Sequence, residues 1–172
     1  MTKESKWERN QIYAECNRGI KLALEGKFEK AEQTYRTIIS ALETNQQACP
    51  PDVYQQLACA LSEQNKNEEA LTFHQLAFQK MQEASSNEPT LRVGRFFLTE
   101  QLNKMKRYEE TLTYLEGISK EPLLLCIEAM ARRELGQTEA ANVIAKEALA
   151  LCESEQQIQG ISARLHKAGF QV

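Results

Sequence analysis

Four short segments of this chain share one pattern, in which a helical stretch ends, the chain turns, and a small residue follows in the next helical stretch. They lie at residues 24–31, 63–70, 104–111 and 134–141. A helix-turn-helix unit that recurs every 20 to 50 residues or so is typical of a helical repeat array. The pattern therefore predicts an all-helical chain built from stacked hairpins.

The turns and the prolines indicate where the helices end and begin. Gly26, Asn65 and Gly136 stand where a left-handed residue closes a helix, and Lys106 holds the matching place in the third turn. All four prolines fall at expected helix starts, and Ser5 with Glu8 forms a capping box for the first helix. The predicted helices span about residues 6–25, 28–46, 51–64, 67–85, 89–104, 108–119, 122–135, 138–152 and 155–168.

The small residues after the turns give the length of the repeat. Ala31, Ala70, Thr111 and Ala141 are 39, 41 and 30 residues apart. These intervals scatter about the 34 or so residues of a tetratricopeptide unit. The two long intervals contain polar stretches, at residues 45–50 and 83–88, which we expect to be loops between repeats.

The residues around these anchors resemble the tetratricopeptide repeat family. The second copy matches best, with Tyr54, Leu57, Ala58 and Leu61 at the positions of the family's first helix. Arg18, Glu128 and Arg132 depart from the family pattern, because apolar residues are usual there. The resemblance implies a right-handed superhelix of about four hairpins in one domain over residues 1–172. Its repeats would span about 12–46, 51–85, 89–119 and 122–152, with a capping helix at 155–168.

The resemblance also implies a binding groove lined by the first helices of successive repeats. The family's groove positions correspond to Cys16, Ile20, Gln55, Cys59, Ser62, Phe96, Glu100, Asn103, Cys126, Met130 and Arg133. This mixture suits an amphipathic helix or an extended peptide. Packing between helices explains Ile20, Phe96 and Met130 equally well, since helical spacing alone does not separate the two faces. The family's carboxylate clamp is disfavoured, because its positions lack the required lysine, arginine and asparagine.

Composition and motifs argue against several other classes. The net charge is -3 and the basic residues are dispersed, so no nucleic-acid partner is expected. No apolar run approaches the roughly 20 residues of a membrane span, and no signal peptide is expected. The five cysteines are widely spaced and favour a reducing, cytoplasmic location. Neither a metal nor another cofactor is expected, since no close cysteine pair and no phosphate-loop pattern occurs.

The sequence thus predicts a protein or peptide interaction scaffold without a catalytic step. A small cytosolic chaperone or adaptor for a secreted or assembling substrate is an alternative with the same architecture. An enzyme that depends on a thiol or a metal is an alternative from another class, through Cys16, Cys59 and Cys126. A homodimer formed by an apolar patch near Trp7 is a further possibility.

Overall fold

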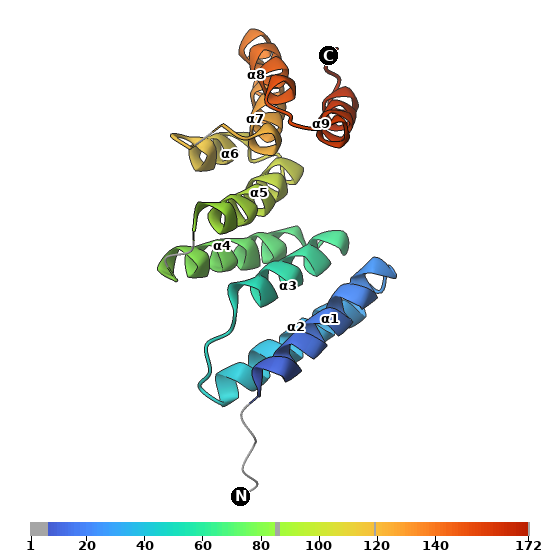
Figure 1. Ribbon diagram of the computed structural model, residues 1–172, viewed down its shortest axis with the longest axis vertical. Coiled ribbons are helices and arrows are strands. Elements are labelled where there is room, and N and C mark those ends of the chain that lie inside the picture. Colours follow the sequence, from blue (N-terminus) through green and yellow to red (C-terminus); the bar gives the residue numbers. More distant parts are fainter. Residues whose placement is uncertain (1–6, 85–86, 119, 172) are drawn as a thin grey trace, which may run out of the picture. The chain divides into compact units, whose positions relative to one another are not determined.

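The computed structural model describes residues 7–84, 87–118 and 120–171. Over these residues the chain forms nine α-helices and no strand, as Figure 1 shows, so the prediction of an all-helical fold is confirmed. The helices are α1 (Arg9–Leu24), α2 (Phe28–Thr44), α3 (Pro51–Glu63), α4 (Asn67–Glu83), α5 (Glu88–Lys104), α6 (Tyr108–Leu115), α7 (Pro122–Glu134), α8 (Thr138–Ala150) and α9 (Glu155–Lys167).

The four predicted turns share one backbone conformation. Gly26, Asn65, Lys106 and Gly136 have φ angles of 73°, 59°, 61° and 77°. Glycine enters this left-handed region without a steric penalty and asparagine enters it at low cost, whereas lysine is strained there. Lys106, the exception to the glycine or asparagine of the other three turns, therefore takes the same conformation although its residue type disfavours it.

Two helix ends differ from the sequence prediction. Helix α1 begins at Arg9, where Glu8 and Gln11 form the capping box, and the predicted cap Ser5 lies outside the described residues. Helix α6 ends at Leu115 instead of residue 119, because Glu116 is extended and Gly117 has a φ of 69°. A glycine in this conformation ends the helix earlier than the apolar pattern suggests.

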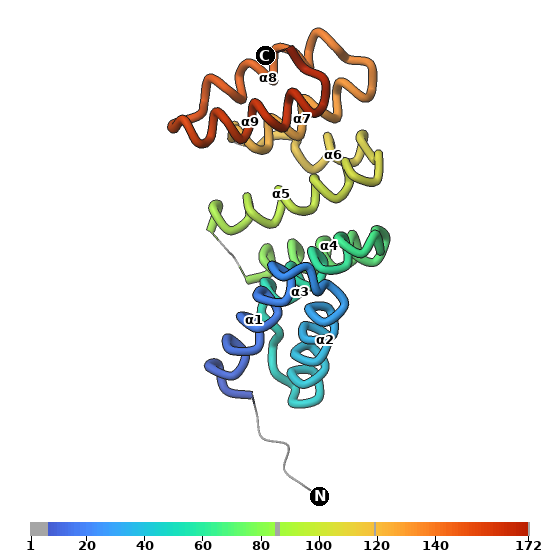
Figure 2. Tube along the Cα trace, turned by 90° about the vertical axis from the view of Figure 1, so that its right-hand side faces the viewer, coloured from blue at the N-terminus to red at the C-terminus, as the bar shows by residue number. Residues whose placement is uncertain are grey.

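The chain divides into two compact units, Met1–Gly94 and Arg95–Val172. In the first, α1 packs against α2, α2 against α3, and α3 against α4, as Figure 2 shows. Its core joins Tyr35 and Ile38 of α2 to Leu57 and Leu61 of α3, all fully buried. The small anchor Ala31 is also fully buried, which lets neighbouring helices approach closely.

In the second unit α7 packs against α6, α8 and α9, and α8 also packs against α9. The contact face of α8 is a row of alanines, fully buried against Ile161 and Leu165 of the capping helix α9. Ile158, predicted on the same stripe, is 43% exposed. The single domain and the repeat bounds given above stay predictions.

Candidate binding surfaces

Five of the predicted groove residues lie in the first unit, on α1 and α3. Ile20 of α1 is 38% exposed, whereas Gln55 of α3 is only 3% exposed. Cys16, Cys59 and Ser62 are half-buried, and Cys16 packs against the core. These five side chains therefore combine core and surface positions.

Gln55 belongs to a buried polar pair between α3 and α4. Its Nε2 atom lies 2.8 Å from Nδ1 of His74 and 3.8 Å from Sγ of Cys59. Burial lowers the pKa of His74 to about 4, so the imidazole is neutral at pH 7 and its Nδ1 accepts the hydrogen bond from Gln55. The pair is a packing contact in which the Gln55 amide oxygen is buried without a donor among the described residues, and a neutral buried histidine is unsuited to bind an anionic partner.

Two of the three cysteines of the enzyme alternative, Cys16 and Cys126, do not have the properties of catalytic thiols. Burial raises the pKa of Cys16, and it raises the pKa of Cys126 to about 11. A thiol with a raised pKa carries little thiolate, which is the nucleophilic form. Within residues 7–84, 87–118 and 120–171, no group of three or more histidine, cysteine or acidic side chains is placed to hold a metal.

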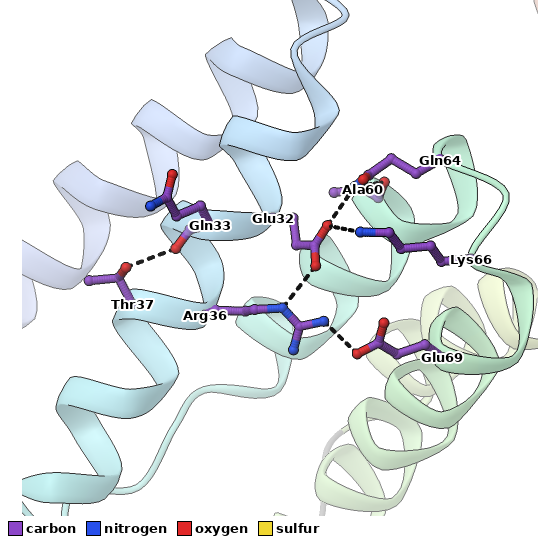
Figure 3. A network of polar contacts seen from close by, with 8 residues as sticks. All are labelled: Glu32, Gln33, Arg36, Thr37, Ala60, Gln64, Lys66 and Glu69. Carbon is purple, nitrogen blue, oxygen red and sulfur yellow. Dashed lines mark hydrogen bonds and ion pairs between the residues drawn. The ribbon is translucent and has the colours of Figure 1, made fainter.

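A charged network joins three helices of the first unit (Figure 3). Glu32 of α2 accepts hydrogen bonds from Arg36, at 2.9 Å, from Gln64 at the end of α3, at 2.8 Å, and from Lys66, at 2.7 Å. Arg36 also pairs with Glu69 of α4. Burial raises the pKa of Glu32, but these hydrogen bonds outweigh it and lower the pKa to about 2. The network thus links α2 of the first hairpin to α3 and α4 of the second.

An open groove of about 970 Å³ follows the surface of α2 beside this network. We call it the α2 groove. Its charged lining includes Glu32, Arg36 and Lys66, which bond to one another, and its other side chains are mostly small and polar. None of the eleven predicted residues lines it. Glu29 also lines the groove and is exposed, and apart from this carboxylate the groove offers a partner little charge that is not already matched within the chain.

Three predicted residues meet in a groove of about 340 Å³ in the second unit, which we call the α5–α7 groove. They are Glu100 and Asn103 of α5 and Met130 of α7. The full lining is Glu100, Asn103, Lys104, Tyr108, Ile127, Met130, Glu134 and Ala168. Apolar side chains from α7 alternate with polar groups from α5 and α6. A pocket with an apolar lining and a few converging polar groups is typical of a ligand site.

Asn103 has a fixed orientation in this groove. Its Nδ2 atom donates a hydrogen bond to the main-chain carbonyl of Ile127, at 3.2 Å. The amide oxygen is out of contact with solvent, and no donor among the described residues reaches it. A buried acceptor without a donor carries an energetic cost, and because no solvent reaches this oxygen it is closed to a bound molecule as well.

Glu100 also takes part in an ion pair with the capping helix. Arg164 of α9 donates to the Glu100 carboxylate, and its guanidinium lies 5.5 Å from the centre of the Phe96 ring. The side chains of Arg164 and Glu100 are 39% and 40% exposed. Ion pairs this exposed contribute at most about 1 kcal/mol, so the pair can be exchanged at low cost. Phe96 and Glu100 together already hold one guanidinium.

The last two predicted residues lie away from the α5–α7 groove. Cys126 is 1% exposed and packs in the core among α7, α8 and α9. Arg133 lies over the ring of Phe170, 4.8 Å from its centre, and lines a separate polar pocket with residues of α8. Their places on α7 turn them toward the following helices, so we leave both out of the proposed site.

Five lining residues were missed from the sequence: Lys104, Tyr108, Ile127, Glu134 and Ala168. Ile127 and Glu134 stand three residues before and four after Met130, so helical periodicity could have found them. Tyr108 is the first residue of α6, directly after the tight turn at Lys106. The groove prediction considered only the first helix of each repeat, so it omitted Tyr108. Its hydroxyl donates to Glu134 at 3.3 Å.

None of the helices among the described residues combines the length and the apolar character that crossing a membrane requires.

Comparisons with known proteins agree with this geometry at the level of the fold. No family model matches the chain, and no curated protein matches it either. The crystal structure of a thermophilic tetratricopeptide repeat protein from Thermus thermophilus superposes with a TM-score of 0.63. It is 18% identical in sequence, and the match covers 92% of this chain and 83% of that one. The chain thus has the fold of a tetratricopeptide repeat protein.

Proposed function

We propose that this protein is an interaction scaffold that holds a segment of a partner protein in the α5–α7 groove. The supporting observation is the lining of this groove, in which the apolar side chains of Ile127, Met130 and Ala168 lie beside the carboxylates of Glu100 and Glu134. A peptide can match both kinds of lining, because its main chain carries N–H donors and its side chains bury apolar surface. No catalytic step and no cofactor belong to this proposal, and a cytoplasmic location is part of it.

Selection from a library of random twelve-residue peptides displayed against the whole chain tests the proposal. We expect Met130→Lys to abolish binding of the selected peptides, because it places a charge on the apolar lining of the groove. Val143→Lys is the matched control, since Val143 is 67% exposed on α8 and away from the groove. Helical circular dichroism establishes that both variants fold. Equal binding by the two variants would contradict the proposed site.

A second candidate function, self-association, is favoured by an exposed apolar stripe on α1. Tyr13, Ile20 and Leu24 are 55%, 38% and 84% exposed and lie along one side of the helix. Trp7, in contrast, is half-buried against the core, and its main chain exchanges two hydrogen bonds with the Gln47 side chain. Light scattering of the chain and of Leu24→Glu tests this alternative. A monomeric mass for both would exclude it at the concentration used.

A further inference from the structure

The α5–α7 groove carries an excess of hydrogen-bond acceptors. Glu100, Asn103 and Glu134 line it, and Lys104 is the one cation among its eight lining residues. The hydrogen bond that Glu134 accepts from Tyr108 is long, at 3.3 Å, and comes from a neutral hydroxyl. A partner carboxylate would therefore meet two like charges, those of Glu100 and Glu134, whereas a cation would meet two carboxylate acceptors.

The apolar part of the lining sets a second requirement. Ile127, Met130 and Ala168 lie among these acceptors, so a ligand group must combine an aliphatic stem with a donor-rich end. Arginine and lysine have this construction, because their methylene stems bury against apolar surface while the charged end stays with polar groups. A volume of about 340 Å³ is at the small end of ligand pockets and suits one long side chain.

The chain itself shows how a guanidinium is held at the edge of this groove. Arg164 bonds to Glu100 and lies over the Phe96 ring. Arginine forms such a combination readily, since its planar group stacks on an aromatic ring while its N–H groups bond to a carboxylate. Because this pair is about 40% exposed on both sides, an incoming arginine can share or replace it.

We infer that the α5–α7 groove recognises a basic side chain, arginine above lysine, within the bound segment of a partner protein. This inference rests on the proposed function, because it names the partner chemistry of the same site. The stem of the basic residue lies along Ile127 and Met130. Its charged end bonds to Glu134 and Glu100.

The peptide selection described above separates this inference from the proposed function. Selected peptides enriched in arginine or lysine support both. Peptides that lack basic residues and still lose binding in Met130→Lys would overturn the inference and leave the proposed function standing. No selected peptide at all would overturn both.

A selected peptide, synthesised with its arginine and again with citrulline at that place, tests the charge directly. Citrulline keeps the shape of arginine and removes its positive charge, so we expect binding about tenfold weaker by isothermal titration calorimetry. Glu134→Gln should weaken binding of the arginine peptide by about three- to tenfold, whereas Glu139→Gln, an exposed position on α8, should leave it unchanged. Equal affinity for the two peptides would overturn the inference.

Arg164→Gln gives an outcome that a purely structural role would not produce. If Arg164 competes for Glu100, its removal frees the carboxylate, and the arginine peptide should bind about two- to fivefold more tightly. The citrulline peptide should gain nothing from the same change. Weaker binding of the arginine peptide by a variant with native circular dichroism would contradict the inferred competition.

Discussion

In the unit Met1–Gly94 Arg36 and Lys66 of the α2 groove both bond to Glu32, whereas in Arg95–Val172 the Glu134 carboxylate of the α5–α7 groove accepts one long hydrogen bond, from Tyr108. Glu32 accepts three hydrogen bonds from within the chain. The α2 groove is the larger of the two, at about 970 Å³ against about 340 Å³. Groove size is therefore a poor guide to the proposed binding site, because most charges of the larger groove are matched internally.

The first unit also buries a titratable side chain, that of His74, which pairs with Gln55. Its titration gives the largest change in the free energy of unfolding that we expect. His74 has a pKa of about 4 in the folded chain against 6.5 when unfolded. Between these values the unfolded chain binds a proton that the folded chain does not bind, so the free energy of unfolding falls as pH drops from about 6.5 to about 4. The loss is on the order of 3 kcal/mol.

Urea unfolding followed by circular dichroism at a series of pH values measures this loss. His74→Gln should remove most of the slope in that window, since glutamine does not titrate and its amide oxygen can still accept from Gln55. A slope that persists in the variant would show that other groups cause it.

Two glycines, one in each unit, should respond in opposite ways when they are replaced by alanine, as measured by the free energy of unfolding. A Cβ at Gly19 of α1 would lie 2.5 Å from Cζ of Tyr35, whose ring is fully buried and has no room to move. We expect Gly19→Ala to lower the free energy of unfolding by about 2 kcal/mol. Gly160 on α9 is exposed with nothing within 4 Å, so Gly160→Ala should raise it by about 0.5–1 kcal/mol.

Chemical denaturation of both variants tests this contrast. Tyr35→Leu serves as the control background, because it removes the ring with which the added methyl group of Gly19→Ala would clash. In that background Gly19→Ala should cost much less than it does alone, and an undiminished cost would show that the clash is not the cause.

The charged network of the first unit should contribute less than the buried pair. Glu32→Gln removes the charge that Arg36 and Lys66 face, and we expect a loss of about 1–2 kcal/mol. The side chain of Glu32 is 13% exposed, and its pKa is lowered from 4.5 to about 2. Its contribution is therefore complete above about pH 4.5 and disappears as pH falls toward 2, below the window of His74.

Thermal unfolding at pH 7 and at pH 3 checks this assignment, with Glu29→Gln as the control on the same helix turn. Glu29 is exposed and forms no ion pair among the described residues. The difference between wild type and Glu32→Gln should shrink at pH 3. A difference that is independent of pH would indicate lost packing instead of lost charge.

The sequence was sufficient for the helices because their signals are local. Apolar spacing, prolines at helix starts and small anchors such as Ala31 depend on neighbours along the chain, and they placed every helix within a few residues. Which residues line a groove depends on how each helix is rotated about its own axis. Cys126 and Met130 stand one turn apart on α7, yet one packs in the core and the other lines a groove.

Contacts between distant residues were outside the reach of the sequence pattern. Glu100 and Arg164 are 64 residues apart and belong to helices that are not consecutive. Glu32 and Lys66 are 34 residues apart. In the sequence each of these residues is an ordinary surface charge. Only the fold shows that Glu32 is paired within the chain, whereas Glu100 lines an open groove.

The smallest effect we expect compares one turn from each unit. Asn65 and Lys106 occupy equivalent left-handed positions, with φ angles of 59° and 61°. Asparagine tolerates this conformation and lysine does not, so Lys106→Gly should raise the free energy of unfolding by about 0.5–1 kcal/mol, whereas Asn65→Gly should change it little. The gain is smaller than the full strain, because glycine also increases the entropy of the unfolded chain. Urea denaturation of the two variants measures the difference, and equal responses would show that the repeat pattern, and not the residue type, sets the cost of this turn.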